Sequence, residues 1–249
     1  MEFEYKYGLV ASNHFIFKRI CDYISFENTD SFLHEMEVMF MKLNYTNKTV
    51  LDIGCGNGLM SIYLSLKYPD VKIDAIDENK GRGAKRDILL SLDEIIIRFK
   101  LENINVIDVN YWDHDKKYDL IVARHSLHHI PHLIEPNNDI LIIEDNCRQY
   151  IKLFNKLFNN LNRGGELIFS DVVRNNIFTW MPQRLAFKFR NVRWGTKPTF
   201  KEWIRFIRKY FIDVEYIYLI PRPLIFMHCI WFLGFPYIFP NIIFRCKKM

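Results

Sequence analysis

The sequence of 249 residues is poor in glycine and cysteine and has no low-complexity tract or internal repeat. It is 49% hydrophobic and 25% charged, which excludes a disordered, collagen-like or purely coiled-coil chain. The five cysteines are scattered and form no C-x-x-C pair, so the sequence predicts neither a disulfide framework nor a zinc site. The first residues lack the basic and apolar regions of a secretory signal. We therefore expect a cytoplasmic protein in which residues 1–249 form a single domain.

The net charge of +5 is mild for a chain of this size, so it does not by itself indicate binding to nucleic acid. The ten glycines and 39 aromatic residues are distributed unevenly. Seven glycines but only 10 aromatic residues lie in 48–171, whereas 1–47 and 172–249 hold 10 and 19 aromatic residues. This contrast indicates that the middle and the two flanks have different roles.

Stretches typical of strands alternate with stretches typical of helices through the middle of the chain. We expect strands at 48–53, 71–76, 104–109, 118–123, 166–171, 212–219 and around 242–244, and helices after 58, at 83–99 and at 146–161. Such alternation predicts right-handed crossovers and a mainly parallel sheet that is buried on both faces. Residues 1–47 have helical periodicity, with Ser31 as a predicted helix cap.

The first of these strands runs directly into a glycine-rich turn, Asp52-Ile53-Gly54-Cys55-Gly56-Asn57-Gly58, and a helix follows. Glycine allows both the sharp turn and a close approach of the backbone to a ligand. The carboxyl edge of a parallel sheet is where nucleotide-like ligands bind. A phosphate-binding P-loop is excluded, because the Lys-Ser or Lys-Thr pair that begins the helix of such a loop is missing.

The segment Val50-Leu51-Asp52-Ile53-Gly54-Cys55-Gly56-Asn57-Gly58 resembles the first motif of class I S-adenosylmethionine-dependent methyltransferases, specifically the small-molecule branch with quinone and sterol methyltransferases. Four more blocks follow in the family's order, at 76–77, 107–109, 118–122 and 161–167. The resemblance covers about residues 45–172 and the final strands. It implies an α/β fold with a Rossmann-like, seven-stranded, mostly parallel sheet and helices on both faces. It further implies a helical cap over 1–47, a cofactor-binding core over 48–172 and an acceptor-pocket region with the last strands over 173–249.

The resemblance also implies the residues that bind S-adenosylmethionine. The turn formed by Gly54, Cys55, Gly56, Asn57 and Gly58 would pass under the methionine portion, and Asp52 would reach the ammonium group through water. Asp77 would accept from the two ribose hydroxyls. Asp108 would accept from the adenine amino group, the Val109 backbone would face the ring, and His125 would lie against the cofactor. The alternative for Asp77 and Asp108 is that they are plain helix-cap or turn residues. We interpret Asp119, which precedes a buried strand, as a turn or edge residue and not as a ligand of the cofactor.

Four of the eight histidines lie within residues 125–132, directly after the predicted fourth strand. Histidine is the natural base near neutral pH, so His128 or His129 is a candidate catalytic base for methyl transfer. The alternative is that this stretch only packs against the cofactor or caps the next segment, as it commonly does in the family. No metal site is predicted, because the cluster lacks the carboxylates of magnesium-dependent catechol methyltransferases.

The absence of two motifs argues against two classes of methyl acceptor. The chain lacks the Asn/Asp-Pro-Pro-Tyr/Phe block of methyltransferases that act on exocyclic amino groups of nucleobases or on glutamine amides. It also lacks the Pro-Cys nucleophile of enzymes that methylate cytosine C5. Residues 174–209 carry ten Lys or Arg and one acid, which suits an RNA-binding groove or simply a solvated helix face. Thr199 and Glu202 have the spacing of a helix capping box.

The uncharged run 223–244 is long enough to cross a bilayer, but two prolines interrupt it, so a transmembrane helix is disfavoured. Combined with the basic stretch, it suits an acceptor with an anionic group and a lipophilic body, or a peripheral contact with anionic lipid. We therefore expect methylation of a small lipophilic or aromatic acceptor, with an RNA methyltransferase or an RNA-binding relative as the alternative.

Overall fold

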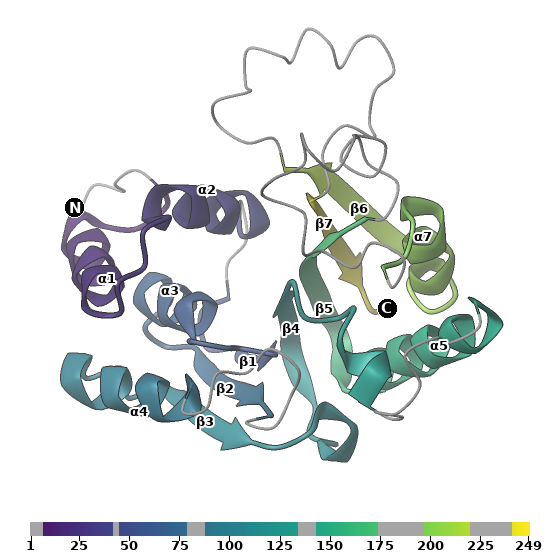
Figure 1. The fold of residues 1–249 in the computed structure, drawn as a ribbon, viewed down its shortest axis with the longest axis horizontal. Helices are drawn as coiled ribbons and strands as arrows, with labels where there is room; N and C mark the ends of the chain where they lie inside the picture. The colour runs from purple at the N-terminus through teal and green to yellow at the C-terminus, as the bar shows by residue number, and fades with distance from the viewer. Residues whose placement is uncertain (1–6, 42–44, 79–87, 134–142, 174–196, 220–240) are drawn as a thin grey trace, which may run out of the picture.

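The computed structural model describes residues 7–41, 45–78, 88–133, 143–173, 197–219 and 241–249 (Figure 1). Its centre is a seven-stranded sheet with the strand order β3-β2-β1-β4-β5-β7-β6. The strands are β1 (Thr49–Ile53), β2 (Lys72–Asp77), β3 (Ile104–Asp108), β4 (Tyr118–Arg124), β5 (Leu161–Val172), β6 (Asp213–Tyr218) and β7 (Asn241–Lys247). The strand order reverses between β1 and β4, which is where open α/β sheets bind ligands.

The first five strands are parallel to one another, whereas β7 lies antiparallel between β5 and β6. Parallel neighbours need crossover connections, and the sequence provides helices for them. The carboxyl ends of β1, β2, β3, β4 and β5 therefore meet at one edge of the sheet. All the site residues that the sequence predicts lie at or directly after four of these ends.

Helices cover both faces of the sheet, because each strand alternates its apolar side chains between two cores. Val50, Ile73 and Val122 belong to one core and Leu51, Ile121 and Phe169 to the other. The first core packs against α1 (Ala11–Tyr23), α2 (Thr29–Met39), α3 (Leu59–Lys67) and α4 (Ile88–Phe99). The second packs against α5 (Ile143–Asn159) and α7 (Phe200–Arg208). Figure 1 shows α1 to α4 together on one side of the molecule and α5 and α7 on the other.

The predicted fold class is confirmed, with small differences at the ends of elements. The fifth strand begins at Leu161, because the segment with the two glycines continues the pairing with β4 through a register shift. The predicted cap at Ser31 is wrong, since α2 begins at Thr29 with Asn28 as its N-cap residue. Of the predicted helix 83–99, the structure describes Ile88–Phe99.

The predicted capping box at the start of α7 is confirmed. The Thr199 hydroxyl accepts from the Glu202 backbone N–H, and the Glu202 carboxylate accepts from the Thr199 backbone N–H. Much of the basic stretch 174–209 and of the apolar run 223–244 lies outside the described residues. Among the described helices, none is long and apolar enough to cross a membrane.

Candidate active site

The glycine-rich turn after β1 is held in a left-handed backbone conformation. Gly54, Gly56 and Gly58 have φ values of 67°, 53° and 72°. The backbone N–H groups of Gly54 and Cys55 both donate to the Ile76 carbonyl at the end of β2, and Gly58 donates to the Cys55 carbonyl. The turn is thereby fixed against β2 before α3 begins at Leu59.

The three glycines differ in the space beside them. A Cβ atom at Gly54 would lie 2.5 Å from the Cβ of Ser126, and one at Gly58 would lie 2.3 Å from a methyl carbon of Leu92. A Cβ at Gly56 would meet nothing within 4 Å. Packing therefore requires glycine at the first and third positions, whereas the middle position borders open space where a ligand can approach the backbone.

Asp52 lies at the end of β1, fully buried beneath this turn. Its Oδ2 accepts a hydrogen bond of 2.6 Å from the Ser61 hydroxyl of α3. Its Oδ1 is also buried and has no hydrogen-bond partner among the described residues. Burial raises the pKa of Asp52 to about 7; Ser61 opposes this shift and Asp77 adds to it. An unpartnered buried carboxylate oxygen is costly unless a donor or cation reaches it.

Asp77 closes β2 next to the turn. Its Oδ2 accepts from the Gly56 backbone N–H at 2.7 Å, and its Oδ1 accepts from the Glu78 backbone N–H at 2.7 Å. Asp108 is in register with Asp77 on the neighbouring strand, and its side chain is exposed. The sheet thus places Asp52, the glycine turn, Asp77 and Asp108 along one edge, in the order β1, β2, β3.

A family model described as a methyltransferase domain matches residues 13–212, which is most of the chain and includes all of this edge. The chain belongs to the class I S-adenosylmethionine-dependent methyltransferases. S-Adenosylmethionine is therefore its cofactor, and the predicted enzyme class is confirmed.

Relatives of this methyltransferase differ in the acceptors that their names state. The chain is 30% identical over 144 residues to "Ribosomal RNA small subunit methyltransferase C" of Buchnera aphidicola, a match that covers 56% of the chain and 40% of that protein. It is 27% identical over 123 residues to "(S)-tetrahydroprotoberberine N-methyltransferase" of Eschscholzia californica, covering 47% of the chain and 33% of that protein. The chain thus matches less than half of the length of either curated relative.

Among solved structures, the chain is similar to geranyl diphosphate C-methyltransferase of Streptomyces coelicolor, which was solved with S-adenosyl-L-homocysteine. The TM-score is 0.60 at 12% identity, and the match covers 87% of this chain and 81% of that one. A likeness at this identity confirms the fold and leaves the acceptor open.

The residues at this edge fit the cofactor, which supplies a methyl group on a positively charged sulfur. The unpartnered Oδ1 of Asp52 suits the ammonium group, and the open space at Gly56 lets the cofactor approach the turn. Asp77 sits where its carboxylate can accept from hydroxyl groups. These assignments, together with Cys55, Asn57, Asp108, Val109 and His125, stay predictions.

The loop after β4 lies against both the glycine turn and β5. The Ser126 hydroxyl donates to the Ile53 carbonyl at 2.6 Å, and the His129 backbone N–H donates to the Ser126 carbonyl. His125 has a φ of 53°, which side chains rarely adopt, and its backbone N–H donates to the Ser170 carbonyl. Burial lowers the pKa of His125, against the effect of Glu35.

The two candidate bases have different surroundings. His128 is buried, and its Nδ1 lies 2.6 Å from Oδ1 of Asp171 at the end of β5. His129 is exposed, and its ring centroid lies 3.9 Å from that of His128. The structure therefore gives a carboxylate partner to His128.

Glu35 of α2 reaches the carboxyl ends of β4 and β5. Its Oε2 accepts from Nε and Nη2 of Arg124 at 3.0 and 2.9 Å, and its Oε1 accepts from the Ser170 hydroxyl at 2.5 Å. Burial would raise the pKa of Glu35, but Arg124, His125 and Ser170 together lower it. The Arg124 guanidinium also lies over the Phe32 ring, 5.0 Å from its centroid.

Sequence reasoning missed Glu35, Arg124, Ser170 and Asp171 as members of this edge. Asp171 could have been predicted as a site residue from the sequence, because it is an acid at the end of a predicted strand, as Asp77 is. Glu35 could not, since only the packing of α2 shows that this residue lies over β4 and β5. Within the described ranges, no group of three or more His, Cys, Asp or Glu side chains could hold a metal ion.

Proposed function

We propose that this methyltransferase transfers the methyl group of S-adenosylmethionine to a small, lipophilic or aromatic acceptor. The observation that carries the proposal is the contact of α2 with the carboxyl ends of β4 and β5. Glu35 is only 3% exposed, and its bonds to Arg124 and Ser170 hold α2 across this part of the edge. A covered edge suits a small molecule better than a long polymer.

Two of the compared proteins support a small lipophilic acceptor by their names. The Eschscholzia californica relative is named for the N-methylation of tetrahydroprotoberberine, and the Streptomyces coelicolor structure contains geranyl diphosphate. The second ligand joins an apolar chain to an anionic group, as the composition of residues 174–244 leads us to expect for the acceptor.

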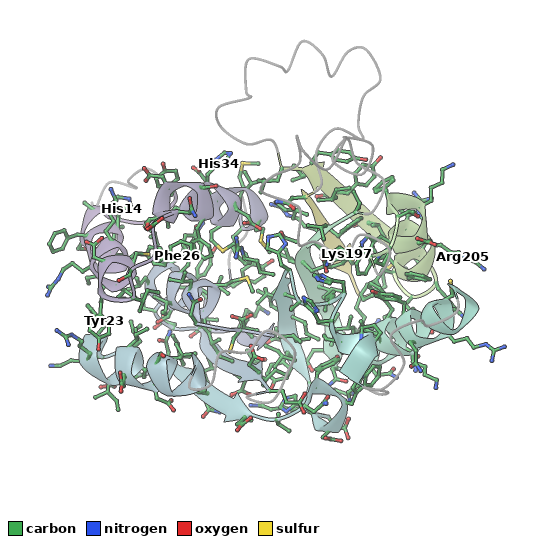
Figure 2. All side chains as sticks on the ribbon, in the orientation of Figure 1. His14, Tyr23, Phe26, His34, Lys197 and Arg205 are labelled. Carbon is green, nitrogen blue, oxygen red and sulfur yellow. The ribbon has the colours of Figure 1, made fainter. Side chains whose placement is uncertain are left out.

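A second candidate acceptor is RNA, and it is supported by the outer face of α7. Lys201, Arg205, Arg208 and Lys209 are exposed there, at helical spacing. In Figure 2, Arg205 lies on the outer side of α7 and Lys197 on the side toward the sheet. A row of cations suits phosphate contacts, and the Buchnera aphidicola relative is named as a ribosomal RNA methyltransferase.

The first experiment measures S-adenosylmethionine binding by calorimetry. We expect a dissociation constant in the micromolar range for the wild type, and much weaker binding for Gly56→Arg, which fills the open space, and for Asp77→Ala. Asp119→Asn, near the start of β4 and so at the opposite ends of the strands, is the matched control and should bind like the wild type. Absence of binding to well-folded wild-type protein would refute the proposed function.

The second experiment separates the two acceptors with tritiated S-adenosylmethionine. A small-molecule enzyme should label an organic extract of cells and leave purified RNA unlabelled. The charge-reversal variant Lys201→Glu, Arg205→Glu, Arg208→Glu should then keep its activity. Labelled RNA, with a loss of that labelling in the charge-reversal variant, would favour the second candidate instead.

A cytoplasmic location with a peripheral membrane contact stays a prediction. Co-sedimentation with vesicles that contain phosphatidylserine tests this contact. Loss of co-sedimentation on deletion of residues 223–240, which spares β7, would support it. Failure of the intact protein to co-sediment would contradict it.

A further inference from the structure

His128 and Asp171 form a buried imidazole–carboxylate pair that joins the loop after β4 to the end of β5. Oδ1 of Asp171 lies 2.6 Å from Nδ1 of His128, and Oδ2 accepts from the His128 backbone N–H at 3.2 Å. One carboxylate thus fixes both the backbone and the ring of the same residue. The ring orientation is determined by the fold before any acceptor binds.

The carboxylate of Asp171 is stabilised in its ionised form. Burial would raise the pKa of Asp171, but His128, His125 and the Val172 backbone N–H together lower it below the ordinary value. The Val172 N–H donates to Oδ1 at 2.7 Å. An ionised carboxylate can only accept hydrogen bonds, so the proton of a neutral His128 ring belongs on Nδ1.

This arrangement leaves Nε2 of His128 with a lone pair. Nε2 makes no hydrogen bond to any residue that the structure describes, whereas Nδ1 is fully engaged. If Nε2 takes up a proton, the positive ring faces the negative charge of Asp171 at hydrogen-bond distance. The geometry of the pair therefore suits a general base: Nε2 is a defined acceptor atom, and Asp171 lies on the opposite side of the ring.

The His128–Asp171 pair also lies close to the glycine turn, at the carboxyl ends of the strands. Two residues before His128, Ser126 bonds to the Ile53 carbonyl and packs against Gly54 of the glycine turn. The loop that carries His128 is therefore in direct contact with the turn that we assign to the cofactor. Lys197, which precedes α7, is buried nearby and interacts electrostatically with Asp171.

We infer that Asp171 is a positioning residue that presents Nε2 of His128 as a general base for an acceptor that loses a proton on methylation, and we assign that acceptor group as a hydroxyl. This inference rests on the proposed function. The acceptor oxygen forms a bond to the methyl carbon, and the carbon–sulfur bond breaks with its electron pair remaining on sulfur. The hydroxyl proton passes to Nε2 of His128. The positive charge that sulfur loses appears on the imidazolium, opposite the Asp171 carboxylate.

The first test measures the tautomer of His128 by nitrogen NMR on histidine-labelled protein, with His128→Gln used to assign the signals. We expect the neutral ring to carry its proton on Nδ1, with Nε2 unprotonated. In Asp171→Asn the amide can donate to Nδ1, so the proton should move to Nε2, as happens when a catalytic aspartate beside histidine becomes asparagine. A wild-type ring protonated on Nε2 alone would overturn the inference.

The second test compares two phenols of similar size, 4-methylphenol and 4-nitrophenol, at mildly alkaline pH. The nitrophenol is already ionised and needs no base, whereas 4-methylphenol must lose its proton during transfer. Asp171→Asn should lower kcat for 4-methylphenol by about 10³-fold with little change in KM, and should lower kcat for 4-nitrophenol by less than about tenfold. Equal losses for both phenols would mean that Asp171 has only a structural role.

Controls separate this inference from the proposed function. Asp119→Asn replaces a carboxylate near the start of β4, at the opposite ends of the strands, and should leave kcat unchanged for both phenols. If Asp171→Asn does not fold, His128→Gln should show the same difference between the two phenols. If the wild type binds S-adenosylmethionine but methylates neither phenol, a simple phenolic hydroxyl is not the acceptor group, while the proposed function stands.

Discussion

The burial of Asp52 makes the stability of this methyltransferase depend on pH in a way that one substitution can isolate. Asp52→Asn keeps the shape of the side chain and removes its titration. The folded pKa is about 7, against 3.8 for a free carboxyl group. The difference of about three pKa units corresponds to about 4 kcal/mol of unfolding free energy.

The sign follows from the direction of the shift. Between about pH 4 and pH 7 the folded protein keeps a proton that the unfolded chain has lost, so wild-type stability falls as pH rises through this window. Above about pH 7 both states are ionised and the effect is constant. Relative to the wild type, Asp52→Asn should therefore become more stable by about 4 kcal/mol as pH rises through this window.

Urea denaturation of both proteins at a series of pH values measures this difference. Asp119→Asn is the control, because its hydrogen bonds to Thr49 and Asn162 lower the pKa of Asp119 although burial would raise it. The contribution of Asp119 is therefore lost only at lower pH, and its variant should run parallel to the wild type above about pH 5. If the Asp52→Asn curve also runs parallel to the wild type, Asp52 is not a buried carboxyl with a raised pKa.

The raised pKa of Asp52 also leads us to expect that cofactor binding depends on pH. A cationic ammonium group favours ionised Asp52, so binding below about pH 7 should release a proton and weaken by up to about tenfold per pH unit. Calorimetry in buffers with different ionisation enthalpies counts that proton. Asp52→Asn should bind more weakly and release none.

Three further predictions concern stability and are measured by urea denaturation. Gly56→Ala should cost only about 1 kcal/mol, because its Cβ meets open space, whereas Gly54→Ala should cost about 3 kcal/mol or more, and the reverse order would contradict the assigned geometry. Arg124→Met should cost about 3 kcal/mol, because it leaves the buried Glu35 carboxylate without its cation, and adding Glu35→Gln should recover part of the loss. Thr199→Ala should cost about 1 kcal/mol through loss of the capping box.

Local patterns were enough to predict the elements around the glycine turn. Three closely spaced glycines between a strand pattern and a helix pattern predict a sharp turn, because glycine readily adopts a left-handed backbone, and the structure shows positive φ values at all three. The acids after β2 and β3 lie at one edge because parallel strands align their carboxyl ends. The start of β5 was predicted less well, at residue 166 instead of Leu161. The segment with the two glycines belongs to the strand and continues its pairing with β4, whereas the sequence pattern placed this segment before the strand.

The sequence by itself determined the fold class and the glycine turn, because the alternation of strands and helices and the spacing of the glycines are local patterns along the chain. Only the tertiary structure decided which distant groups meet there. Asp171 partners His128 across 43 positions, and Glu35 reaches Ser170 across 135 positions. Such pairs depend on how strands align and how α2 packs, which hydrophobic periodicity does not encode. The folded chain thereby turns one histidine of a cluster into a candidate base with a defined acceptor atom.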